Sequence, residues 1–346
     1  MRLLTSILIA FWFCSPGLAQ QFVLINGQVI DGTGKARVSA SVRVRDGKIA
    51  EIGAFKPQTG ETVLDVKGMI VAPGVVDLQN VSPSAVQKDP SAASLIVQGV
   101  TTAVLGSDGT GHYSVEDYMV PFDEKPPALN IAMLVGHGTV RRQIMGPDYK
   151  RPATADEIQR MSELVSEAMK QGAFGLGSNL QQEPASFSTA EEVKALVQVM
   201  AKFGGTFVTT LRNESEKRAA SVTEVVALAR DARIPVQVLT TNRTARAEIE
   251  KSRGPRVDIA ADSYSFAQLV GDKAITLERA MQRMSATPAS RLALRERGVL
   301  KKGDPADIVV FNPLNLTAGM KLVFVNGAIA VKDGQPTGEH SGQALR

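Results

Sequence analysis

Six polar side chains that could bind a metal ion or transfer protons come at or near the ends of apolar runs: Asp77, Asp108, His137, Arg212, Glu214 and Asp262. A cluster of aspartate, histidine and glutamate can ligate a metal or act in general acid–base catalysis. If the runs are strands of a β/α barrel, these side chains gather at the face where barrel active sites form. We therefore take four of them as candidate catalytic residues: Asp108, His137, Arg212 and Glu214.

Each candidate also has a structural interpretation, which is the favoured one. Asp77 and Asp262 can accept hydrogen bonds from loop backbone, and Asp108 can stabilise a turn. His137 can contact the Gly-rich loop, and Arg212 can form an ion pair with Glu214. No Gly-x-Ser-x-Gly, P-loop or His-Glu-x-x-His motif is present, and the Gly-rich run at 106–112 lacks a phosphate-binding spacing.

The elements that would position these residues alternate between strand and helix. Strands are expected at 70–78, 100–106, 129–135, 173–177, 205–211, 234–240 and 257–262. Capping boxes open helices at Thr154 with Glu157, at Thr189 with Glu192 and at Ser221 with Glu224. Alternating β and α units predict a parallel sheet and hence a (β/α) TIM-type barrel. Only about seven strands are found where a closed barrel needs eight, so we expect a truncated barrel, with a last helix at 277–284.

Short apolar runs with Asn-Gly and Asp-Gly turns lie at both ends of the chain. Turns are expected at Asn26-Gly27, Asp46-Gly47 and Asn326-Gly327, which predicts hairpins. We expect one small β-sandwich built from both ends, with two independent β domains as the alternative. The predicted division is a signal peptide at 1–19, a composite β-sandwich from 20–69 and 299–346, and a barrel at 70–298.

The composition and the N-terminal residues indicate which partners to expect and in which compartment the protein is located. The 346 residues are 44% hydrophobic and 21% charged, and the net charge of +4 without a dense basic patch argues against nucleic acid. Arg2, the apolar run 3–13 and a small-residue site ending at Ala19 predict a cleaved signal peptide and a periplasmic or secreted protein. A retained N-terminal anchor is the alternative. The only cysteine, Cys14, would leave with the signal, and no membrane contact is expected afterwards.

Six segments together resemble the amidohydrolase superfamily, specifically its N-acyl-D-amino-acid deacylase (D-aminoacylase) branch. The entry strand "GMIVAPGVVDLQNV" (68–81) is similar to the superfamily's Pro-Gly-x-x-Asp-x-His-x-His motif, and "TPASRLALRERGVLKKGDPADIVVFNP" (287–313) to its C-terminal stretch. The other four resemble barrel strands two to five: "QGVTTAVLGSDG" (98–109), "NIAMLVGHGTVR" (130–141), "GAFGLGSNLQQEP" (172–184) and "GGTFVTTLRNES" (204–215).

This resemblance implies a zinc ion that activates water for hydrolysis of carbon–nitrogen bonds other than peptide bonds. The family's four histidine ligands correspond to Gln79, Val81, Thr210 and Thr240, and its cysteine ligand corresponds to Asp108. Valine has no donor atom, and a zinc site needs about three His, Cys or carboxylate ligands. The segment expected to carry the family's catalytic aspartate has no counterpart, which coincides with the missing eighth strand. We therefore predict a degenerate metal site and no bound zinc.

By lineage, then, the chain is expected to be a D-aminoacylase-like amidohydrolase that has lost zinc-dependent catalysis, a pseudoenzyme. One alternative is an active hydrolase with a site rebuilt around Asp108, His137 and Glu214. Another is a non-catalytic exported protein that binds a small molecule, forms a homo-oligomer or pairs with an intact relative. A third is an unstable relic without function.

Overall fold

The computed structural model describes residues 21–261, 275–315 and 319–346, without the side chains of 80 and 81. The predicted signal peptide at 1–19 and the candidate Asp262 lie outside the described residues. No helix within the described ranges is long and apolar enough to cross a membrane.

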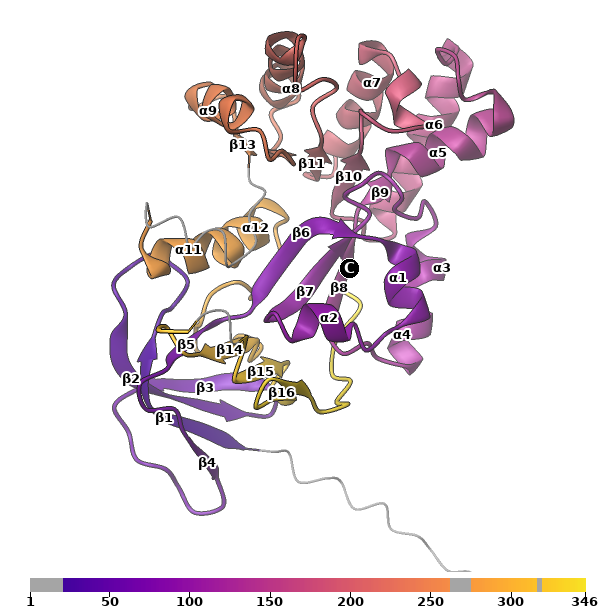
Figure 1. The fold of residues 1–346 in the computed structure, drawn as a ribbon. Coiled ribbons are helices and arrows are strands. Elements are labelled where there is room, and N and C mark those ends of the chain that lie inside the picture. Colours follow the sequence, from indigo (N-terminus) through magenta and orange to yellow (C-terminus); the bar gives the residue numbers. More distant parts are fainter. Residues whose placement is uncertain (1–20, 262–274, 316–318) are drawn as a thin grey trace, which may run out of the picture.

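Both ends of the chain build one nine-stranded sheet (Figure 1). Its strands are β1 (Phe22–Val29), β2 (Val38–Arg45), β3 (Lys48–Gly53), β4 (Thr62–Asp65), β5 (Ile70–Pro73), β14 (Ile308–Phe311), β15 (Leu322–Val325), β16 (Ala328–Lys332) and β17 (Gln335–Pro336). The antiparallel pair of β5 with β14 joins the N-terminal strands to the C-terminal ones. The expectation of a composite β unit agrees with this arrangement, whereas two independent β domains do not.

The sheet curls onto itself around an apolar core. Phe22 of β1 and Phe324 of β15 are separated by two strands in the sheet order, yet their ring centroids lie 5.4 Å apart. Strands are spaced about 4.8 Å apart in a flat sheet, so the sheet must bend to bring these rings together. The unit is therefore a single folded sheet with a sandwich-like interior.

Two of the three predicted turns are present, and the third is a bulge. Asp46-Gly47 and Asn326-Gly327 connect hairpins, and all four residues have positive φ, as a type I′ turn requires. The Asn26-Gly27 pair instead lies inside β1, where only Asn26 has positive φ and the register with β2 shifts between Leu24 and Gly27. The predicted turn at 26–27 is therefore wrong, because one left-handed residue makes a bulge rather than a reversal.

The described residues in the middle of the chain form the parallel strands of a (β/α) barrel. They are β6 (Val75–Val81), β7 (Val100–Leu105), β8 (Asn130–Met133), β9 (Val135–Gly136), β10 (Gly175–Ser178), β11 (Thr206–Thr209), β12 (Val236–Val238) and β13 (Ile259–Ala261). They pair as β6-β7-β8 and as β9 to β13 in order. Since β8 and β9 are one strand interrupted at Leu134, the described residues contain seven strand positions, as expected from the sequence.

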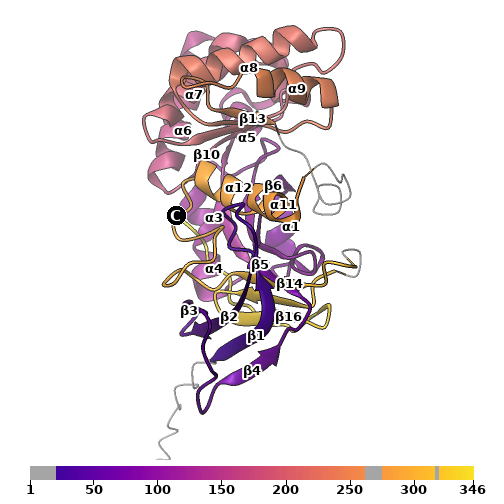
Figure 2. The same ribbon diagram turned by 90° about the vertical axis from the view of Figure 1, so that its left-hand side faces the viewer.

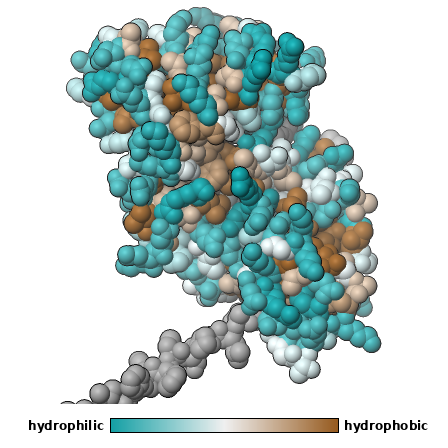
Figure 3. Space-filling view, turned by 180° about the vertical axis from the view of Figure 1, so that it is seen from behind, coloured by the Kyte–Doolittle hydropathy of each residue, from teal (hydrophilic) through white to brown (hydrophobic). Residues whose placement is uncertain are grey.

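Helices cover the outside of the strands (Figures 1 and 2). Beside the first three strands lie α1 (Pro83–Lys88), α2 (Ala93–Ile96), α3 (Val115–Met119) and α4 (Pro121–Glu124). The outer layer over β9 to β13 consists of α5 (His137–Met145), α6 (Ala155–Lys170), α7 (Ala190–Ala201), α8 (Arg218–Ala232) and α9 (Arg243–Lys251), with short 3₁₀ turns at Gly146–Asp148 and Ala185–Phe187. The space-filling view from behind shows mostly hydrophilic side chains over these helices (Figure 3).

Two helices, α11 (Leu277–Met284) and α12 (Ala286–Arg291), lie beside β6. The guanidinium of Arg291 pairs with Asp258, which precedes β13, and donates to the carbonyl of Val236 in β12. The helix pair thus contacts β6 on one side and, through Arg291, β12 and the segment before β13 on the other.

Two of the predicted helix starts are correct. Thr154 and Glu157 form a reciprocal capping box at α6, and the Thr189 side chain accepts a hydrogen bond from the backbone of Glu192 at α7. The predicted start at Ser221 is wrong, because α8 already begins at Arg218. The Ser221 hydroxyl instead donates to the carbonyl of Lys217, one turn earlier in the chain.

Removing the α6 cap should measurably destabilise the protein. We expect Thr154→Ala to lower the free energy of unfolding by about 1 kcal/mol, because the N3 backbone amide loses its acceptor. Urea unfolding followed by far-UV circular dichroism measures the change. Thr154→Ser keeps the hydroxyl and serves as the control; an equal loss in both variants would contradict the capping role.

Candidate ligand-binding site at the carboxyl ends of the strands

A polar pocket of about 310 Å³ lies at the carboxyl ends of β7, β9 and β10. Asp108 reaches it from the loop after β7, Arg142 from the second turn of α5, and Glu183 from the loop after β10. Among its other lining residues are Gly109, Thr110, Gly138, Thr139, Asn179 and Gln182. We name it the Asp108 pocket. It contains both charge signs and several neutral donors and acceptors.

Glycines let the loop after β7 pack directly against β9. A Cβ atom on Gly111 would lie 1.8 Å from the carbonyl oxygen of Leu134, and one on Gly136 would lie 2.5 Å from that of Gly109. The Gly-rich run at 106–112 is therefore a close backbone contact that shapes the wall of the Asp108 pocket.

Asp108 has the turn role expected from Ser-Asp-Gly. One carboxylate oxygen accepts hydrogen bonds from the backbone amide of Thr110 at 3.0 Å and from its hydroxyl at 2.6 Å. The structural interpretation is thus confirmed, and the partly exposed carboxylate still lines the pocket.

His137 does not line the Asp108 pocket, although it is the first residue of α5. Its side chain is 1% exposed, with Nδ1 2.8 Å from the Ser178 hydroxyl and Nε2 2.9 Å from a Glu192 carboxylate oxygen. The other Glu192 oxygen pairs with Arg141, which is completely buried. The structure therefore separates His137 from Asp108 and places it in a buried His–Glu–Arg network.

Charges within this network determine the ionisation of Glu192. Burial raises the pKa of its carboxyl group, but the hydrogen bond and charge of His137, followed by those of Arg141, outweigh burial and lower the pKa overall. Glu192 is therefore ionised at neutral pH. Arg141 also donates to the backbone carbonyl oxygens of Tyr149, Arg151 and Phe187, so the network connects α5, α7 and the segment after α5.

Arg212 and Glu214 do not pair with one another. The Arg212 guanidinium binds both oxygens of Glu224 in α8, at 3.0 and 3.2 Å, and donates to the carbonyl of Ser188. The carbonyl of Glu214 accepts a hydrogen bond from the Asn242 side chain. The expected Arg212–Glu214 ion pair is wrong, since a carboxylate from the following helix is better placed. Neither residue lines the Asp108 pocket.

Asp77 and Gln79, at the end of β6, line a separate cavity of about 60 Å³ with Gln237, Leu239 and residues of α11 and α12. The Asp77 carboxylate accepts a 2.7 Å hydrogen bond from the backbone amide of Gln79, which confirms its expected backbone contact. Burial raises the pKa of Asp77 to about 6, and this hydrogen bond offsets only part of the effect.

The two threonines at expected ligand positions have hydrogen-bond partners within the chain. The Thr210 hydroxyl donates to the Asn179 side chain at 3.1 Å, and the Thr240 hydroxyl accepts from the backbone amide of Asn242 at 3.0 Å. The Val81 side chain and Asp262 lie outside what the structure describes.

The donor set in the described part of the chain does not fit a zinc ion with three protein ligands. Within those residues, no group of three or more His, Cys, Asp or Glu side chains could hold a metal ion. Gln79, Thr210 and Thr240 offer amide and hydroxyl groups, which are poor zinc ligands. That the protein in solution holds no zinc stays a prediction.

Known proteins place this architecture and sequence in one superfamily. No family model matches the chain. A D-aminoacylase from Alcaligenes xylosoxydans xylosoxydans is 30% identical over 70% of this chain and 57% of its own length, and an N-acyl-D-glutamate deacylase from the same organism is 27% identical over 70% and 56%. The chain thus spans little more than half the length of these curated relatives.

Solved structures agree on the fold. A crystal structure of D-aminoacylase matches with a TM-score of 0.86 at 24% identity, covering 94% of this chain and 99% of that one. The N-acyl-D-glutamate deacylase from Bordetella bronchiseptica, solved with zinc and a phosphonate inhibitor, matches with a TM-score of 0.80 over 95% and 99%. The chain therefore has the TIM-barrel fold of the amidohydrolases. Within that superfamily it belongs to the D-aminoacylase-like proteins.

Sequence reasoning missed the partners of His137 and the residues around Asp108. Arg141 lies four positions after His137, which places both side chains on one face of a helix, so this spacing was a usable signal. Glu192 was interpreted only as a capping residue. No local pattern connects Arg142 or Glu183 with Asp108, because one residue lies in a helix and the other two lie in separate loops.

Proposed function

We propose that this D-aminoacylase-like chain binds N-acyl amino acids in the Asp108 pocket and does not hydrolyse them by zinc-dependent chemistry. The ligand class comes from the names of the relatives, D-aminoacylase and N-acyl-D-glutamate deacylase. The observation that carries the loss of hydrolysis is the donor set, because Thr210 and Thr240 present hydroxyl groups that are used in internal hydrogen bonds.

The pocket has groups that complement such a ligand. An N-acyl amino acid carries a carboxylate and an amide, and a guanidinium binds carboxylates with paired hydrogen bonds. Arg142 supplies this group, and its guanidinium carbon lies 4.6 Å from the centre of the Tyr149 ring, which holds it by a cation–π contact. Thr139 and Asn179 line the same pocket and offer hydrogen bonds to an amide.

Binding without turnover is the expected result for purified protein. Isothermal titration with N-acyl-D-glutamate should detect binding, while amine release stays at background and metal analysis finds less than one zinc per chain. Arg142→Gln should weaken binding about tenfold or more, because a charge-assisted contact contributes roughly 1.5–3 kcal/mol.

Arg160→Gln, an exposed arginine of α6 outside the pocket, is the matched control and should leave the affinity unchanged. One zinc per chain together with turnover would overturn the loss of hydrolysis. Absence of binding, or equal weakening by both variants, would overturn the assignment to the Asp108 pocket.

A hydrolase rebuilt around Asp108, His137 and Glu214 has less support, since the three side chains do not share a pocket. Export remains a proposal supported by Arg2, the apolar run 3–13 and the small-residue site at Ala19. Assembly, as a homo-oligomer or with an intact relative, also stays a prediction.

A further inference from the structure

A second, larger hollow lies between α9, the end of β13 and the helix pair α11–α12. Its volume is about 780 Å³, and Figure 2 shows α9 above α11 and α12 on the same side of the molecule. Six arginines line it: Arg243, Arg246, Arg253, Arg279, Arg283 and Arg291. We name this hollow the arginine groove.

Positive charge is concentrated in the arginine groove. Its described lining contains one acidic residue, Glu250, against six arginines, which leaves a net charge of +5. The entire chain carries +4. The described lining of the groove is therefore more positive than the chain as a whole.

Two of the six arginines form ion pairs with described carboxylates. Glu250 pairs with Arg253 at 3.1 Å, and Asp258 pairs with Arg291 at 2.7 Å. For Arg243 and Arg283 no hydrogen bond or ion pair is present among the described residues, and both side chains are exposed. Like charges held together repel one another, and a bound anion relieves that repulsion.

The groove adjoins the small cavity at the end of β6. Arg283 and Thr287 line both the arginine groove and the small cavity that contains Asp77 and Gln79. The helices that form its lower wall are the ones that pack beside β6. Its described lining differs in chemistry from that of the Asp108 pocket, which contains both charge signs.

We propose that the arginine groove binds a small polyanion that carries at least two phosphate or carboxylate groups. Its volume lies in the range of small-molecule sites, roughly 300–1,000 Å³. Guanidinium groups match the geometry of both oxyanions through paired hydrogen bonds. A membrane surface or a nucleic acid would instead need a basic patch or stripe on an accessible face, whereas these arginines surround a hollow.

The test uses pyrophosphate and citrate as probes of the two oxyanion chemistries. Isothermal titration of the full chain at about 150 mM salt, where exposed long-range charges are screened, should detect saturable binding of at least one probe. Arg243→Gln/Arg283→Gln should weaken that binding tenfold or more. The probe that binds more tightly identifies the preferred oxyanion.

Arg160→Gln/Arg295→Gln removes the same net charge from exposed positions outside the groove and should leave affinity unchanged. Circular dichroism checks that both double variants are folded; should the groove variant be unfolded, Arg283→Gln alone replaces it. The proposal is overturned if neither probe binds at millimolar concentration, or if both double variants weaken binding equally. Tighter groove-dependent binding of phosphatidylserine vesicles or an RNA oligonucleotide would also overturn it.

Discussion

Replacing Glu192 with alanine is expected to lower the free energy of unfolding by about 3–5 kcal/mol, the usual effect of removing one partner from a buried ion pair. The carboxylate has no exposed surface and binds both His137 and the fully buried Arg141. Without it, the Arg141 charge keeps only backbone carbonyls as partners. The penalty arises mainly from that uncompensated buried charge.

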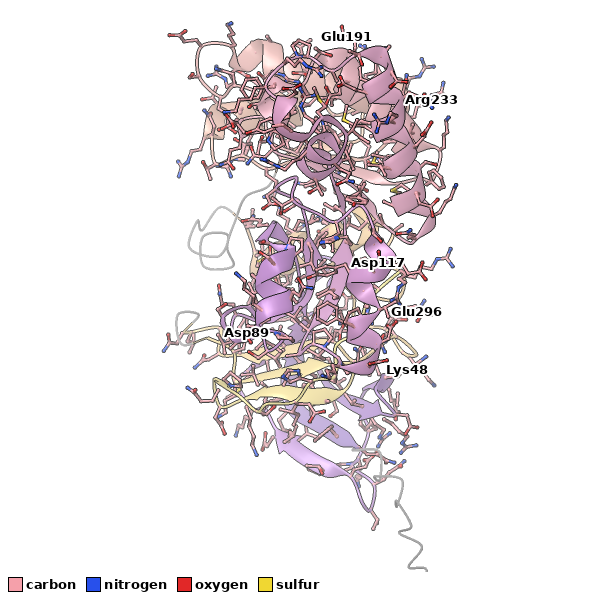
Figure 4. The ribbon with its side chains drawn as sticks, turned by 90° about the vertical axis from the view of Figure 1, so that its right-hand side faces the viewer. Lys48, Asp89, Asp117, Glu191, Arg233 and Glu296 are labelled. Atoms are coloured by element: carbon pink, nitrogen blue, oxygen red, sulfur yellow. The ribbon has the colours of Figure 1, made fainter. Side chains whose placement is uncertain are left out.

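The neighbouring residue provides a matched control. Glu191 precedes Glu192 in the first turn of α7, but its side chain lies on the outer surface (Figure 4). Glu191→Ala makes the same truncation and charge change and should have little effect. Urea unfolding followed by far-UV circular dichroism compares the two variants. Equal stability of both would show that the buried network contributes nothing measurable.

Local sequence patterns predicted the strands and helix starts, because each pattern depends only on residues close together in the chain. Apolar runs placed the later barrel strands within a few residues, and the capping box at Thr154 set the start of α6. The expected single strand at 70–78 is wrong, because the structure divides it between β5 of the nine-stranded sheet and β6 of the barrel. The same reasoning failed at Asn26-Gly27, where a long strand absorbs a left-handed residue as a bulge. Pairing with β4 and β5 on the other side of β1 decides this outcome, and that information is far away in the sequence.

The candidate site was harder to predict because its contacts join distant segments. His137 and Glu192 are 55 positions apart, and a helix with two glutamates in its first turn gives no sign of which one is buried. Arg212 has a carboxylate two residues away in Glu214, yet it binds Glu224, because the loop before α8 orients it toward that helix. Proximity in sequence favours an ion pair only when the backbone between the two residues allows it.

The two recesses differ in the elements that form them. The loops after β7, β9 and β10 enclose the Asp108 pocket, which contains both charge signs. The arginine groove is formed by α9, the end of β13 and the helices α11 and α12, and its described lining is strongly positive. The two recesses are therefore suited to ligands of different charge.

Asp77 should make the protein less stable as the pH rises from about 4 to about 7. Its pKa is about 6 in the folded chain against 3.8 for an unperturbed aspartate, so the folded state holds the proton more tightly. This contribution to stability is fully present below pH 3.8 and is lost as the pH rises through 6. A difference of about two pKa units corresponds to roughly 3 kcal/mol.

Asp77→Asn removes the titrating proton and keeps the size of the side chain, so its free energy of unfolding should lack this fall. Relative to the unaltered protein, the variant should gain up to about 3 kcal/mol between pH 4 and pH 7 in urea unfolding. Asp148→Asn, an exposed aspartate outside the cavity, is the control and should give parallel pH profiles. Parallel profiles for Asp77→Asn would contradict the prediction, because they would show that folding does not raise the pKa of Asp77.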